Sequence, residues 1–181
     1  MKPPSTQKTQ GKAGIRIRLD ATITRFLLSF LVISIALYFL TTAFELYIPL
    51  FSQASTAKVL HRLTGMLGME ASLDGTTLSF GNFSLIVVRQ CTGVFELIAI
   101  ASCIAAYRAA LKRKLAGIAI ALPIIYVFNM ARMVILTLVG VHFNPLFDAV
   151  HKYVFQVTFV LFVLAIWVLW IDWVRIRGKG N

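Results

Sequence analysis

The chain has 181 residues, of which 59% are hydrophobic and only 14% are charged, and its net charge is +11. Soluble globular domains carry roughly 25% charged residues, so this composition excludes a water-soluble domain and indicates one membrane-embedded domain. The basic residues form short blocks between apolar runs and are not interleaved with aromatic residues, which excludes a typical nucleic-acid-binding face.

The N-terminal part combines a polar tail with a first membrane span. Residues 1–21 are polar and basic and are predicted to form a disordered cytoplasmic tail. An apolar run follows, and its length predicts a transmembrane helix at 22–44. Because no small-residue cleavage site follows it cleanly, we expect a retained helix and not a cleaved signal peptide.

The segment 45–90 is expected to be an extracytoplasmic insert with some structure of its own. Within 76–88, two alternating apolar runs flank Gly81 and Asn82, a pattern that predicts a β-hairpin with a two-residue turn. An interfacial amphipathic helix is predicted at 57–68. Its apolar residues, which fall largely on one helical face, are Val59, Leu60, Leu63, Met66 and Leu67.

Three more apolar segments predict spans at 91–107, 115–140 and 153–173, followed by a basic tail at 175–181. The last span ends in a group of tryptophans, which favour the membrane interface. The predicted fold is therefore an all-α integral membrane protein. It is a bundle of about four transmembrane helices over 22–174, with the small amphipathic helix and β-hairpin between the first two spans.

The distribution of Lys and Arg predicts the orientation, because cytoplasmic loops carry an excess of these residues. In this topology both termini are cytoplasmic, and the insert and a short loop at 141–152 face outward. The outward side holds Lys58, Arg62, Arg89 and Lys152. The cytoplasmic side holds Lys2, Lys8, Lys12, Arg16, Arg18, Arg25, Arg108, Lys112, Arg113, Lys114, Arg175, Arg177 and Lys179.

Arg132 is the clearest polar exception within the spans. A charge at a helix centre costs roughly 2.5–3.5 kcal/mol on insertion scales, and arginine does not neutralise itself at working pH. Asn129 lies three residues earlier on the same helical face, so the pair is expected to form an inward polar patch. Either this patch contacts a substrate, or Arg132 is structural and pairs with Glu96 or backbone carbonyls, or it reaches the outer interface. Glu96 itself is expected to support the site as a counter-ion.

Cys91 is expected to open the second span. The first turn of a helix has unpaired N–H groups and the positive end of the helix dipole, and both favour the thiolate. Arg89 would act in the same direction. The adjacent Thr92 and Gly93 form a small polar pair, and Gly93 would let a substrate or another backbone approach closely.

His151 is expected at the outward start of the fourth span. A histidine in an exposed loop is usually just solvated, but here the topology places it with Cys91 at the outer surface and Arg132 just beneath. A thiolate attacks a carbonyl, a histidine protonates the leaving amine, and a fixed guanidinium stabilises the oxyanion. The three residues predict a cysteine transpeptidase or protease at a membrane surface.

At these residues the sequence resembles the exosortase and archaeosortase family. The resemblance rests on CTGVFEL from Cys91, NMARMVIL from Asn129, and His151 before the last apolar helix, and it covers roughly residues 87–173. It implies an integral membrane cysteine enzyme in which Cys91, Arg132 and His151 are catalytic. Some archaeal relatives use arginine at the third position, so the histidine indicates a short bacterial exosortase-like member.

The resemblance also implies a substrate and a location. Members of the family process exported proteins that end in a short motif, a transmembrane helix and a basic tail. We therefore expect cleavage of this signal at the outer face of the inner membrane and transfer of the protein to an acceptor. The expected partners are these substrate proteins and membrane lipid, and neither a nucleic acid nor a cofactor is expected.

Three other functions compete with this one. The chain could be a non-enzymatic scaffold subunit of an envelope or polysaccharide export complex, in which Cys91 is incidental. A transporter or channel component would use Asn129 and Arg132 to line an anion path. Metal binding by His61, His142 and His151 lacks ligand-like spacing, and no metal is expected. Cys103 lies too far from Cys91 along a helix for a disulfide and is expected to be an inert apolar residue.

Overall fold

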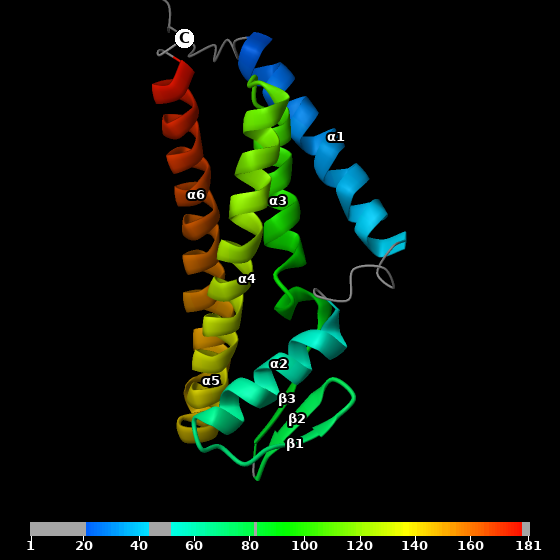
Figure 1. Ribbon diagram of the computed structural model, residues 1–181. Coiled ribbons are helices and arrows are strands. Elements are labelled where there is room, and N and C mark those ends of the chain that lie inside the picture. The colour runs from blue at the N-terminus through cyan, green and yellow to red at the C-terminus, as the bar shows by residue number, and fades with distance from the viewer. Residues whose placement is uncertain (1–20, 44–51, 82, 179–181) are drawn as a thin grey trace, which may run out of the picture.

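The computed structural model describes residues 21–43, 52–81 and 83–178 (Figure 1). Helix α1 (Ala21–Ala43) begins at the end of the molecule where α6 (Phe155–Gly178) finishes. A small unit of one helix and three strands lies at the opposite end of the bundle. Residues 1–20 of the predicted N-terminal tail and the last three residues of the predicted C-terminal tail lie outside the described residues, and Ala21 already belongs to α1.

Three helical segments of the described chain are long and apolar enough to cross a membrane: α1, α4 (Leu111–His142) and the run Asn144–Ile176. The expected second span is a shorter helix, α3 (Val94–Ala106), of 13 residues. At 1.5 Å per residue α3 covers about 20 Å, less than the roughly 30 Å of a hydrocarbon core. The chain is thus a mostly helical membrane protein, as predicted, with three candidate spans and one short apolar helix where about four full spans were expected.

Helix occupies most of the segment 141–152, where an outward loop was expected. After Phe143 the chain enters α5 (Asn144–Ala149), passes through a π-helical turn (Val150–Val154) and continues into α6. Pro145 stands in the first turn of α5, a position where its missing N–H costs nothing and its fixed φ favours a helix. Hydropathy marks the apolar core of a bilayer and not the end of a helix, which explains the difference.

Helix α2 (Gln53–Met66) begins at Ser52, whose hydroxyl accepts a hydrogen bond of 3.1 Å from the amide of Ser55. Its buried face differs from the predicted one, since Met66 and Leu67 are exposed. The buried residues of α2 are Thr56, Ala57, Leu60 and Thr64. Periodicity located the helix and the buried Leu60, but not the buried threonines, because α2 packs against α4 and η3 as well as the sheet.

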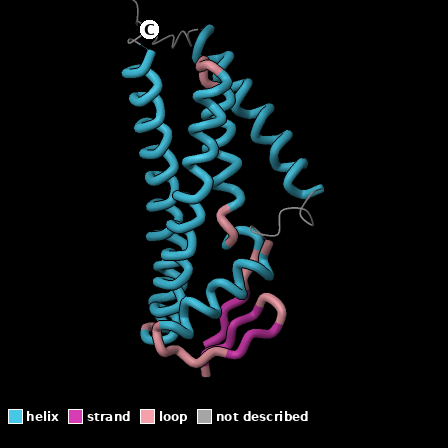
Figure 2. The backbone as a smooth tube through the Cα atoms, in the orientation of Figure 1, coloured by secondary structure: helices cyan, strands magenta, loops and turns pink. Residues whose placement is uncertain are grey.

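The rest of the insert is a three-stranded antiparallel sheet in the order β1 (Ser72–Asp74), β2 (Thr77–Phe80), β3 (Phe83–Ile86). Leu78 pairs with Leu85 across β2 and β3, and both side chains are buried. Two strands were expected in this region, and β1 was not. Figure 2 shows the sheet beside α2, at the end of the bundle away from the C-terminus.

The insert packs directly against the turn that carries Cys91. One hydrophobic cluster joins α2 and the sheet to Cys91 and to Met133 of α4. A second cluster joins α3, α4 and α6 near the other end and includes Trp170. The insert is therefore part of the protein core around Cys91.

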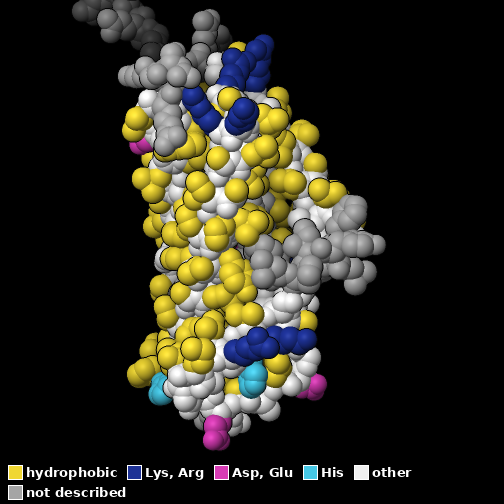
Figure 3. All heavy atoms as spheres, viewed as in Figure 1, with side chains coloured by type: hydrophobic (Ala, Val, Ile, Leu, Met, Phe, Trp, Pro, Cys, Tyr) yellow, Lys and Arg dark blue, Asp and Glu magenta, His cyan; other side chains and the backbone are white. Residues whose placement is uncertain are grey.

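The surface of the bundle is apolar along the helices. Figure 3 shows hydrophobic side chains covering the helices between one group of Lys and Arg at the C-terminal end and another beside α2. None of the residues of α1 is buried within the chain. Such a surface matches the hydrocarbon of a bilayer, so this finding agrees with an integral membrane protein.

Candidate active site

Cys91 lies in a 3-10 turn, η3 (Arg89–Cys91), just before α3. Its amide donates a hydrogen bond of 2.8 Å to the Val88 carbonyl. The N-cap of α3 is Gly93, whose φ of 82° lies in the left-handed region that glycine adopts freely. Cys91 therefore stands two residues before the N-cap, and the expectation that it opens the helix is wrong. The chain needs a left-handed residue to pass from the turn into α3, so the helix starts later than the apolar run.

Asn129 holds this turn from α4. Its side chain is fully buried, and its Nδ2 donates a hydrogen bond of 2.8 Å to the Cys91 carbonyl. A Cβ on Gly93 would lie 3.3 Å from the Asn129 side chain, so glycine also permits this approach. The buried Thr92 hydroxyl donates to the Arg89 carbonyl at 2.9 Å. Asn129, Thr92 and Gly93 thus shape the backbone that carries the thiol.

Arg132 reaches the same turn from the next turn of α4. Its Nη2 donates a long hydrogen bond of 3.4 Å to the Gln90 carbonyl. Its guanidinium lies 4.8 Å from the centre of the Phe159 ring, a favourable cation–π contact where water is scarce. The buried Nε has no hydrogen-bond partner. Arg132 therefore uses a backbone carbonyl, one of the partners expected from the sequence, and keeps an unused donor.

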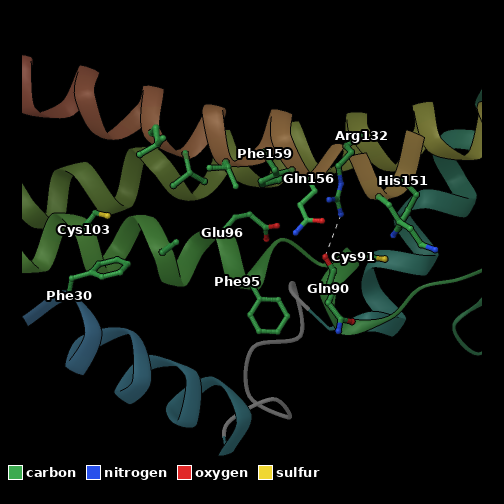
Figure 4. A pocket seen from close by; sticks show the side chains of 15 residues that line it. Phe30, Gln90, Cys91, Phe95, Glu96, Cys103, Arg132, His151, Gln156 and Phe159 are labelled. Carbon is green, nitrogen blue, oxygen red and sulfur yellow. Dashed lines mark hydrogen bonds between the residues drawn. The ribbon is translucent and has the colours of Figure 1, made fainter. Parts of the chain in front are cut away.

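Cys91, Arg132, His151 and Glu96 line one cavity of about 710 Å³. In Figure 4, Arg132 and His151 project from one wall toward the turn that carries Cys91, and Glu96 points into the cavity from α3. The four residues come from η3, α3, α4 and the π-helical turn. The structure therefore brings the three predicted catalytic residues and Glu96 to a single space.

His151 faces this cavity from inside a helix and not from a loop. Its ring stacks on Phe147, with ring centres 5.7 Å apart. Its Nδ1 is buried and has no hydrogen-bond partner. The π-helical turn that contains it is a local widening of the helix, a feature that often occurs at functional sites. One ring nitrogen of His151 is thus free to exchange a proton inside the protein.

The rest of the cavity is apolar. One face of α3 and one face of α6 form its walls, with a contribution from α1. The polar residues gather at the end nearest Cys91 (Figure 4). The apolar lining consists of Phe30, Phe95, Ala99, Cys103, Phe159, Val160, Val163 and Leu164. A ligand that is polar at one end and apolar along its length would match this distribution.

Burial dominates the acidity of the Cys91 thiol. The residue is 3% exposed, and burial raises the pKa of its thiol above the usual range. A backbone hydrogen bond at Val88 and the Arg132 charge lower this pKa, while Glu96 raises it. The sequence predicted a preference for the thiolate and is wrong on this point, because it counted the helix dipole and the charges but not the desolvation.

The cavity residues that were not predicted include three polar side chains, Gln90, Lys152 and Gln156, and the aromatic Phe159. Gln156 could have been found, since it is a polar residue within an otherwise apolar run, the same signal that identified Asn129. Phe159 could not, because an aromatic residue in an apolar helix is unremarkable until a cation lies against it. Among the described residues, no group of three or more His, Cys, Asp or Glu side chains could hold a metal ion.

Comparison with known families gives a match over most of the chain. The family described as Transmembrane exosortase matches residues 18–171. This range contains every cavity residue and extends beyond the half of the chain in which the resemblance was seen. No curated protein and no solved structure shows significant similarity to the chain.

Proposed function

The chain belongs to the transmembrane exosortase family, and from this premise we propose that it is a membrane-embedded cysteine transpeptidase. Its substrates are exported proteins that carry a C-terminal signal of a short motif, an apolar helix and a basic tail. It cleaves this signal at the outer face of the inner membrane and transfers the protein to an acceptor. The observation that carries the proposal is the common cavity of Cys91, Arg132 and His151.

Each of the three residues has a defined role in the reaction. His151 takes the proton of the Cys91 thiol, and the sulfur attacks the carbonyl carbon of the scissile peptide bond. Arg132 stabilises the negative charge on the carbonyl oxygen in the tetrahedral intermediate. His151 then returns the proton to the leaving amine, and the peptide bond breaks to leave a thioester on Cys91. An acceptor nucleophile attacks the thioester and releases the thiol.

The raised pKa of the thiol fits a proton transfer that happens during the reaction. A buried thiol is a poor nucleophile until a base removes its proton, and the neighbouring Arg132 charge favours the anion once it forms. In this scheme the thiolate is generated when substrate has displaced water from the cavity. The family's general chemistry thus needs no preformed thiolate in this chain.

The alternative is a non-enzymatic membrane subunit of an envelope or polysaccharide export complex. One observation favours it: Cys91 is almost fully buried, as an inert structural cysteine would be. In that role Arg132 would only join α4 to η3 and α6, through Gln90 and Phe159.

A reporter experiment tests the proposal. The full chain is co-expressed with an epitope-tagged protein from the same genome that ends in motif, apolar helix and basic tail. Cys91→Ala should slow processing by about 10³-fold or more, since loss of a nucleophile removes the covalent pathway. Ser102→Ala is the matched control, because it also removes one heavy atom from a buried side chain, in α3, but lies outside the cavity lining.

Mass spectrometry provides the second measurement. A thioester should form on the peptide that contains Cys91 and not on the peptide that contains Cys103. Undiminished processing by the Cys91→Ala variant would contradict the enzymatic function and favour the scaffold.

A further inference from the structure

Glu96 is a carboxyl group inside the cavity that the proposed reaction does not use. It stands in the first turn of α3 and lines the cavity together with the three proposed catalytic residues. Its Oε2 is buried and has no hydrogen-bond partner. In Figure 4 the carboxyl group points from α3 toward Gln156, between Cys91 and the apolar part of the cavity. A hydrogen-bond acceptor is therefore available between the thiol and the apolar part of the cavity.

The unpaired Glu96 oxygen would be stabilised by a hydrogen-bond donor. A buried polar oxygen without a partner costs roughly 1–3 kcal/mol, so a ligand that brings N–H groups gains from binding there. Arg132 does not donate to this oxygen in the structure: its Nη2 bonds to the Gln90 carbonyl, and its Nε and the Glu96 Oε2 both have no hydrogen-bond partner. Part of the role of Glu96 is ordinary, because an acid in the first turn of a helix interacts favourably with the positive end of its own dipole.

The substrate of the proposed function carries the matching group. Its apolar helix starts after the scissile bond and continues away from Cys91, along the walls that α3 and α6 provide. The first four N–H groups of any helix have no partner within the helix, and lipid offers none. The positive end of the helix dipole lies at the same place. The start of the substrate helix and the free oxygen of Glu96 are thus complementary in hydrogen bonding and in charge.

We propose that Glu96 is a positioning residue that caps the N-terminal end of the substrate's apolar helix and so sets the register of the scissile bond at Cys91. This inference rests on the proposed function. Where the residue at the start of the substrate helix is apolar or small, the enzyme supplies the cap that the helix lacks. Substrates with their own capping side chain do not depend on Glu96.

The test combines variants of the full chain with two forms of the tagged reporter. One reporter has Ala at the N-cap position of its apolar helix, and the other has Asp there. With the Ala reporter, Glu96→Leu should slow processing by about 2- to 30-fold, the range expected for one lost helix cap. Glu96→Gln should lose less, because its amide oxygen still accepts. With the Asp reporter, Glu96→Leu should slow processing much less than it does with the Ala reporter, because the substrate then carries its own cap and any change in the acidity of Cys91 affects both reporters alike.

Controls separate this role from a structural one. Glu70→Leu, which removes an exposed acid outside the cavity, should process both reporters at the wild-type rate. Where Glu96→Leu accumulates poorly, Glu96→Met keeps a longer side chain of similar shape without an acceptor. If Glu96→Leu slows both reporters equally, the capping proposal is wrong, and Glu96 only stabilises the structure of the enzyme itself. A wild-type rate of Glu96→Leu on the Ala reporter would overturn it too.

Two other outcomes are equally informative. If Glu96→Leu lowers the yield of transferred product and leaves the cleavage rate unchanged, the carboxyl group assists the nucleophile that receives the cleaved protein. That result would refute the proposed capping role. If Cys91→Ala still processes the reporter, the proposed function itself fails, and the cap with it. The two failures are distinguishable because the second concerns Cys91 and the first does not.

Discussion

At the level of single residues, the Cys91 thiol is subject to opposing effects. Burial raises its pKa, the Arg132 charge lowers it, and the Glu96 carboxyl group raises it. The largest of these is burial, because transferring the thiolate out of water removes more stabilisation than one neighbouring charge restores. Cys91, Arg132 and Glu96 all line the proposed site. Substitutions of Arg132 and Glu96 should therefore be measurable as changes in the pKa of the Cys91 thiol.

The rate of alkylation by iodoacetamide, followed against pH in detergent, measures this acidity. The alkylation rate of an exposed thiol, with a pKa of about 8.5, levels off once the pH exceeds that value. Since the pKa of the Cys91 thiol is raised in the folded protein, its alkylation rate should keep increasing at higher pH. Arg132→Gln removes a charge that lowers the pKa, so the midpoint should move to higher pH. Glu96→Gln removes a group that raises the pKa, so the midpoint should move to lower pH. A shift of the midpoint to lower pH in Arg132→Gln would contradict the conclusion that the Arg132 charge lowers the pKa of Cys91.

At the level of elements, a glycine on α4 decides how the sheet docks. A Cβ placed on Gly140 would overlap the ring of Phe83, which is buried on β3. Phe83 also packs edge-on against Phe147, with ring centres 5.1 Å apart. The sheet, α4 and α5 therefore meet at one contact, and this contact belongs to the same part of the molecule as Cys91. The left-handed Gly93 plays a comparable part at the start of α3.

Gly140→Ala should destabilise the chain by about 1–3 kcal/mol, because overpacking forces the Phe83 ring or the sheet to move. The free energy can be followed by denaturant unfolding in detergent, and loosening of the insert by its rate of proteolysis. A second substitution, Phe83→Leu, should recover part of the loss.

Gly65→Ala is the matched control, since it also replaces a helical glycine but its Cβ would contact no other atom. This control should be neutral or stabilising by up to about 1 kcal/mol. Equal stability of Gly140→Ala and the wild type would disprove the contact.

For the whole molecule, the arrangement in the membrane follows from which end carries which residues. The start of α1 and the end of α6 lie at one end, and the sheet lies at the other (Figure 1). The basic residues on the described helices near the first end predict that this end is cytoplasmic. The sheet, η3 and the polar end of the cavity would then face the exterior, where an exported substrate arrives.

Labelling of introduced cysteines in whole cells tests this orientation. Both native cysteines are first replaced by alanine, and a single exposed position is then changed to cysteine. Ser84→Cys, on the sheet, should react with a membrane-impermeant maleimide in intact cells. Lys112→Cys, at the start of α4, should react only after the membrane is permeabilised. The opposite pattern would place the cavity at the cytoplasmic face and exclude processing of exported proteins.

The sequence by itself was enough to identify an apolar chain that crosses a membrane, the approximate place of its helices, and the polar exceptions Asn129 and Arg132. These are local properties, because the cost of placing a residue in lipid adds up along the segment that contains it. The family could be identified for the same reason: the motifs around Cys91, Asn129 and His151 are short and continuous.

Only the tertiary structure decided the length of α3, the helix in place of the loop before His151, the strand β1 and the inward face of α2. It also decided that Cys91 is buried in a turn before α3 and not activated by the first turn of that helix. Each of these depends on contacts between segments far apart in the chain, such as Asn129 with the Cys91 carbonyl and the insert with the same turn. Hydropathy and periodicity describe one segment at a time, whereas burial is a property of the neighbours that folding brings to it.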